Sequence, residues 1–126
     1  VHLGYPLADL ALALSLKGEL DEAVSLMREA VPLLKQQADL LFVLDRFALI
    51  AFLRGHTDSA ARLFGASKAL FEKLGHKRFF DEQHVHDDVL ERLDQAFAPD
   101  ELARLMREGE SMSENEAIAL VLRELQ

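Results

Sequence analysis

The chain has 126 residues, of which 50% are hydrophobic, and its 22 acidic and 14 basic residues give a formal net charge of -8. This length suits a single domain, and the absence of cysteine excludes disulfides, thiolate nucleophiles and cysteine-based zinc sites. The acidic balance repels phosphate backbones and anionic lipid surfaces, so we expect no direct contact with nucleic acid or membrane.

Apolar residues recur at spacings of three and four along almost the whole chain, which contains only 3 Pro and 6 Gly. Because a helix brings such positions onto one face, this period predicts an all-α fold of about seven helices. The predicted helices cover residues 6–17, 20–35, 38–54, 57–74, 81–97, 99–108 and 114–125. No segment has the period of two that is typical of strands.

Glycines mark several of the predicted boundaries. Gly18 and Gly55 lie between successive helices, where a tight turn is needed, and Gly75 and Gly109 lie where C-terminal caps are expected. Pro32 falls inside the second predicted helix, so we expect a kink or an early end there.

The last helix carries a separate start signal. Ser113 followed by Glu116 matches a capping box, in which the hydroxyl and the carboxylate each accept a hydrogen bond from a backbone N–H at the helix start. We therefore expect the C-terminal segment to be a docked helix that belongs to the fold.

Two stretches match at an offset of 37 residues: LKGELDEAVSLMREA at 16–30 and LRGHTDSAARLFGAS at 53–67. The offset pairs Leu16 with Leu53, Gly18 with Gly55, Asp21 with Asp58, Ala23 with Ala60, and Leu26 with Leu63. Glycine permits a tight turn, the acid suits the positive end of the next helix, and alanine allows close helix packing. The pattern predicts one helix hairpin used twice.

The same positions resemble the tetratricopeptide repeat, whose pattern has small residues, a turn glycine and an aromatic or large residue at fixed places. These positions are Ala11, Gly18, Ala23, Met27 and Ala30, and then Ala48, Gly55, Ala60, Phe64 and Ser67. The resemblance implies hairpins stacked as a right-handed superhelix: 1–37, 38–75, and a degenerate third pair with a C-terminal capping helix over 76–126. The alternative is an ordinary all-helical bundle.

The second half also resembles the C-terminal part of the repeat region in large bacterial regulators. The resemblance rests on ARLFGA at 61–66, on Glu108 with Gly109, and on MSENEAIAL at 112–120. Such proteins join an ATPase to tetratricopeptide-like repeats, often with a LuxR-type DNA-binding domain. The resemblance implies a cytoplasmic, non-catalytic module for protein interaction or regulation, whose partner is another protein or another domain. The chain lacks an initiator methionine, and we expect it to be a piece of a longer protein.

The register of the family predicts a groove along the first helix of each repeat. Its candidate binding residues are Tyr5, Leu12, Phe42, Asp45, Leu49 and Phe52. This face is apolar and lacks the Lys, Arg or Asn that would hold a peptide carboxylate, so it suits a partner helix or an apolar ligand. Alternatively, later helices of the chain or a second copy cover it.

The N-terminal hairpin raises a second partner hypothesis. Leu3, Leu7, Leu10 and Leu14 form an apolar side that a preceding repeat would cover, so we expect a homodimer through this hairpin when the chain stands alone.

One segment, HKRFFDEQHVHDD at 76–88, suggests a different chemistry. On a helix Asp81, His84 and Asp88 share a face and could hold a metal, whereas His86 points elsewhere. The alternative function is therefore a metal-dependent enzyme or a metal-binding helical domain. The simpler interpretation is a solvated helix start rich in acids. Because no phosphate loop or serine elbow occurs, we expect no enzyme activity and no cofactor.

Overall fold

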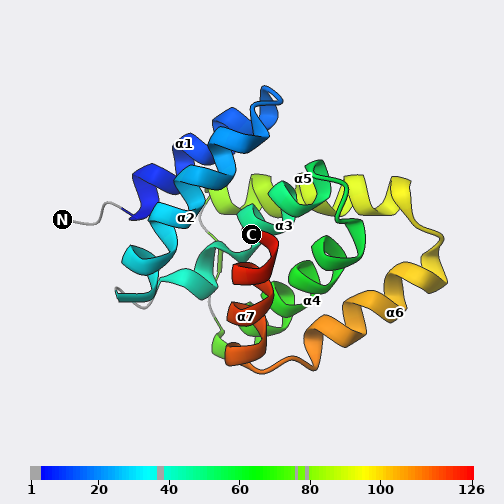
Figure 1. The fold of residues 1–126 in the computed structure, drawn as a ribbon. Coiled ribbons are helices and arrows are strands. Elements are labelled where there is room, and N and C mark those ends of the chain that lie inside the picture. Colours follow the sequence, from blue (N-terminus) through cyan, green and yellow to red (C-terminus); the bar gives the residue numbers. More distant parts are fainter. Residues whose placement is uncertain (1–3, 37–38, 76, 79) are drawn as a thin grey trace.

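The computed structural model describes residues 4–36, 39–75, 77–78 and 80–126, and these residues form an all-α fold with no strand among them (Figure 1). The elements in chain order are α1 (Gly4–Leu16), α2 (Leu20–Gln36), the 3-10 helix η1 (Leu40–Val43), α3 (Leu44–Leu53), α4 (Thr57–Leu74), α5 (Phe80–Ala96), α6 (Pro99–Glu110) and α7 (Glu114–Glu124). None of the described helices combines the length and apolar character needed to cross a membrane.

The seven predicted helices all occur, and the structure corrects two details of them. The segment predicted as one helix over 38–54 consists of η1 followed by α3. Gly109 was expected to cap a helix, but it is buried inside α6. At Pro32 there is no early end, because α2 continues to Gln36. The Gly75 prediction is confirmed, since this residue caps α4 with a left-handed φ of 65°.

The turns of the two hairpins have the same hydrogen-bond pattern at the 37-residue offset. In the first turn, the N–H of Gly18 donates to Ser15 O and that of Glu19 donates to Leu14 O, at 3.0 and 2.9 Å. The second turn repeats these bonds from Gly55 to Phe52 O and from His56 to Ala51 O, at 3.0 and 2.8 Å. Both are Schellman motifs, whose central position has a positive φ that favours glycine. Gly18 and Gly55 have φ values of 88° and 85°.

The equivalent side chains of the two hairpins also have equivalent burial. Met27 and Phe64 occupy the same position in the two hairpins, and each is almost fully buried. Ala23 and Ala60, one helical turn earlier, are completely buried and let the paired helices approach closely. The sequence repeat is therefore also a repeat in packing, and it places α1 against α2 and α3 against α4.

The remaining helices pack around the second hairpin. In Figure 1, α1 and α2 form an antiparallel pair to one side, and α5, α6 and α7 lie around α3 and α4. Helix α6 packs chiefly on α4, and α5 packs chiefly on α3. Helices α5 and α6 make few contacts with each other. The core accordingly centres on α3, most of whose residues are buried, and on α4, half of whose residues are buried.

Helices α4 and α6 approach each other through two glycines. A Cβ atom at Gly65 would lie 2.2 Å from the carbonyl oxygen of Met106, and one at Gly109 would lie 1.9 Å from that of Arg62. Both contacts are with backbone, which has little freedom to move. The absence of a side chain at these two positions is therefore what allows the close packing, and this explains Gly109 within the helix.

Helix α7 is held at both ends. At its start the capping box is confirmed: Glu116 N–H donates to Ser113 Oγ at 3.1 Å, and Ser113 N–H donates to Glu116 Oε1 at 2.9 Å. The bond from the Ser113 N–H lowers the pKa of Glu116. At its end, Arg28 donates to Leu125 O and Arg54 donates to Glu124 O, which satisfies carbonyls that have no partner within the helix.

We expect Gly65→Ala and Gly109→Ala each to lower the free energy of unfolding by about 1–3 kcal/mol, because the added methyl group meets backbone. At an ordinary position in a helix, glycine to alanine raises stability by up to about 1 kcal/mol. Urea denaturation measures the change. Ala119→Gly, on the exposed face of α7, is the control that measures the difference in helix propensity between alanine and glycine in this protein. A gain in stability for either glycine variant would contradict the close contact.

Candidate functional site

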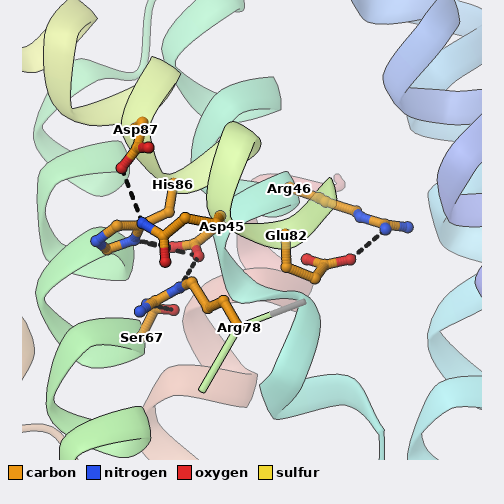
Figure 2. A network of polar contacts seen from close by, with 8 residues as sticks. Asp45, Arg46, Ser67, Arg78, Glu82, His86 and Asp87 are labelled. Carbon is orange, nitrogen blue, oxygen red and sulfur yellow. Dashed lines mark hydrogen bonds and ion pairs between the residues drawn. The ribbon is translucent and has the colours of Figure 1, made fainter. Parts of the chain in front are cut away.

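Two adjacent residues of opposite charge are buried at the start of α3. Asp45 is 2% exposed and Arg46 is 4% exposed, and both follow the 3-10 helix in an otherwise apolar segment. Consecutive residues of a helix point about 100° apart, so the two side chains extend in different directions. Figure 2 shows the result, with Asp45 facing His86 and Arg78 while Arg46 extends away toward Glu82.

Asp45 is held by two cationic or polar partners from later in the chain. Arg78 Nε donates to Asp45 Oδ2 at 2.9 Å, and Nη2 of the same guanidinium donates to Ser67 Oγ at 3.0 Å. The guanidinium also lies over the ring of Phe71, 4.1 Å from its centroid, which is a cation–π contact. His86 Nδ1 lies 3.2 Å from Asp45 Oδ1. A buried carboxylate thus has partners on two sides.

The ring of His86 is fixed by a second contact. It stacks on Phe64 of α4 with ring centroids 4.3 Å apart and planes 17° from parallel. Stacking and the Asp45 contact together orient the imidazole, so α5 is attached to both α3 and α4 at this point.

Arg46 links α3 to the helices on either side. Its Nη1 lies 2.6 Å from Asp9 Oδ1 in α1, and its Nη2 forms an ion pair with Glu82 Oε1 in α5. Burial raises the pKa of Glu82 above its usual value, and the charge of Arg46 opposes this effect without cancelling it. Among the described residues, no hydrogen bond reaches Glu82 Oε2, which is buried. We name Asp45, Arg46, Arg78, Glu82 and His86 the buried charge cluster.

One member of the buried charge cluster, Arg46, lines a groove between α1, α3 and α5. The groove has a volume of about 560 Å³ and is lined by Asp9, Leu12, Ala13, Leu16, Arg46, Leu49, Asp81, His84, Val85 and Asp88. Its floor is apolar and includes Leu49, which is 1% exposed, whereas the carboxylates of Asp9 and Asp81 lie at its exposed edges. The site is therefore a short trough with an apolar base and an acidic rim.

The structure brings only some of the predicted binding residues together. Leu12 and Leu49 line the groove, and Asp45 is buried in the charge cluster. Phe42 instead lines a separate hollow of about 320 Å³ with residues of α4 and α7, where its ring meets Phe71 edge-on at 5.8 Å. Phe52 is half-buried against the core. The Tyr5 side chain lies outside the described residues.

The second wall of the groove contains the residues considered for a metal. Asp81, His84 and Asp88 share one face of α5, as the spacing predicted, and His86 is directed to Asp45 instead. In the described part of the chain, no group of three or more His, Asp or Glu side chains is arranged to hold a metal ion. Here these residues form a wall of the groove together with Val85.

Sequence reasoning missed the buried charge cluster, although a signal for it was present. Asp45 and Arg46 interrupt the apolar run LLFVLDRFALIAF, and charges inside a buried helix require partners. The partners Arg78 and Glu82 lie more than thirty residues away, so spacing alone could not identify them.

We compared the chain with known proteins. No family model, no curated protein and no solved structure matches it. The interpretation of the site therefore rests on its own geometry, and the resemblance to tetratricopeptide-like regulators stays a prediction.

We expect Asp45→Asn to lower the free energy of unfolding by about 3 kcal/mol, because removing this charge leaves the Arg78 guanidinium without its buried counter-ion. Denaturant melts measure the effect. Asp94→Asn, on an exposed position of α5, is the control and changes stability by less than about 0.5 kcal/mol. Equal stability of the Asp45 variant and the wild type would show that the cluster does not hold α5 in place.

The raised pKa of Glu82 predicts a pH dependence. A carboxyl group with a higher pKa in the folded state binds more protons there, so its contribution to stability falls as pH rises from its unfolded pKa through the folded one. The free energy of unfolding of the wild type minus that of Glu82→Gln should therefore decline as pH is raised from about 4.5. Melts of both proteins across this pH range measure it, and a difference that increases with pH would contradict the assignment.

Proposed function

We propose that this chain is a non-catalytic interaction module of tetratricopeptide type, which acts as a sensor or scaffold within a bacterial signalling or transcriptional regulator. The role is that of a docking surface: a partner protein, or another domain of the same polypeptide, binds the helical array in the cytoplasm. The setting in a regulator rests on the sequence resemblance, and the docking role rests on the groove.

The repeated hairpin supports the first part of this proposal. The two Schellman turns and the buried pairs Ala23 with Ala60 and Met27 with Phe64 recur at one offset, as expected for units that stack. In such an array the first helices of successive hairpins lie next to each other and form a continuous face. Helices α1 and α3 both contribute to the groove in this chain.

The groove is the main support for the proposed docking role. Its volume of about 560 Å³ lies within the range of about 300–1,000 Å³ that is typical of binding sites. Leu16, at its edge, is 54% exposed and continues the apolar surface of the groove, so a partner in the groove would cover it. Among its polar side chains, Arg46 and Asp9 form an ion pair that links α3 to α1, which favours a binding role over catalysis.

The homodimer through the N-terminal hairpin stays a separate prediction. Leu10 is 51% exposed, whereas Leu7 and Leu14 are half-buried, and Leu3 lies outside the described residues. Leu10 does not line the groove.

A selection experiment tests the proposed function. A display library of random helical peptides is selected against the intact chain, and enriched peptides are then tested against Leu16→Ser and against Leu10→Ser as the matched control. We expect enriched peptides to lose at least about tenfold in affinity with Leu16→Ser and less than about twofold with Leu10→Ser. Failure to enrich any peptide that Leu16→Ser weakens would contradict a docking function for the groove.

A further inference from the structure

We propose that the groove between α1, α3 and α5 takes a positively charged amphipathic helix of a partner protein. This inference rests on the proposed interaction function and specifies the chemistry of the partner.

The two walls of the groove have the same spacing. On α1 the lining residues are Asp9, Leu12, Ala13 and Leu16, and on α5 they are Asp81, His84, Val85 and Asp88. Both sets follow the positions i, i+3, i+4 and i+7, so each wall is one helical face about 10 Å long, or two turns. A partner helix that lies along the trough would present its own side chains at the same spacing, which is the helix-in-groove mode of recognition.

The base of the groove suits apolar anchors. Leu49 is buried at the base and Val85 in the α5 wall, and the half-buried Leu12 and the exposed Leu16 extend the apolar surface along α1. Covering such surface stabilises a complex by about 25 cal/mol per Å² before the costs of association. Two or three leucine-like side chains on one face of the partner would make these contacts.

The negative charge of the rim indicates which residues flank the apolar anchors of the partner. Side-chain exposure is 64% for Asp9 and 39% for Asp88, and Asp81 is also exposed, whereas Arg46 has a side-chain exposure of only 5%. The positive charge of Arg46 is thus buried and already paired with Asp9 and Glu82. Asp88 also pairs with Arg92 of its own helix at 3.2 Å, but the carboxylates of Asp9, Asp81 and Asp88 all stay exposed to solvent. A partner with Lys or Arg beside its apolar anchors is complementary to this rim.

Charge also argues against two other occupants. A second copy of the chain would bring a second net charge of -8 to an acidic rim, which opposes association. An acidic helix would be repelled by Asp9, Asp81 and Asp88 in the same way.

Two synthetic helical peptides of about 14 residues, each stapled to hold the helix, test the inference. Both carry leucines at i, i+3, i+4 and i+7, and they differ only in having lysine or glutamate on the flanking positions. Fluorescence anisotropy with the intact chain should give at least about tenfold tighter binding for the lysine peptide at low salt, and added salt should reduce this difference.

Two pairs of variants locate the binding. Asp81→Asn combined with Asp88→Asn should weaken the lysine peptide by about tenfold, and Asp21→Asn combined with Asp94→Asn, with the same change in net charge, by less than about twofold. Equal binding of the two peptides, binding of neither, or equal effects of the two variant pairs would overturn the inference. Peptides from the library selection that are weakened by Leu16→Ser but carry no basic residues would overturn it while leaving the proposed function intact.

Discussion

The position of α5 depends on ion pairs made by two neighbouring residues of α3. Asp45 and Arg46 are both buried, and an unpaired buried charge is strongly disfavoured, so other parts of the chain must supply their partners. Arg78 and His86 supply them for Asp45, and Asp9 and Glu82 supply them for Arg46. Such pairs add little net stability compared with apolar packing, but they restrict which arrangements of the helices are acceptable. They thereby determine the groove that α5 forms with α1 and α3.

The backbone provides the frame in which these charges meet. Two Schellman turns reverse the chain in the same way, and they set α1 beside α2 and α3 beside α4. On the other side of α4, Gly65 and Gly109 let α6 approach until backbone meets backbone. Helix α4 is thus fixed by close packing on one side, and its Phe64 and Ser67 orient His86 and Arg78 on the other. Packing and electrostatics act on the same helix, which explains why so much of α3 and α4 is buried.

Local patterns predicted the helices, the repeat and the capping box because each depends on residues close in sequence. Gly18 with Gly55, and Ser113 with Glu116, are signals of this kind. What could not be predicted depends on tertiary contacts. Gly109 was predicted to end a helix. A glycine is needed there for a different reason, because its backbone approaches the carbonyl of Arg62, which lies forty-seven residues earlier in the chain. Phe42 and Leu49 were placed on one face, but the change from η1 to α3 between them directs Phe42 to a different hollow.

The central claim is that the buried charge cluster holds α5 at its distance from α1 and so maintains the groove. The chain has no cysteine, so spin labels can be attached at Leu10→Cys on α1 and Glu91→Cys on α5, both exposed and outside the groove. Pulsed electron resonance then measures the distance between them. We predict a single narrow distribution that becomes broad when Asp45→Asn and Arg46→Gln are introduced together. An unchanged narrow distribution in a variant that remains folded by circular dichroism would contradict the claim.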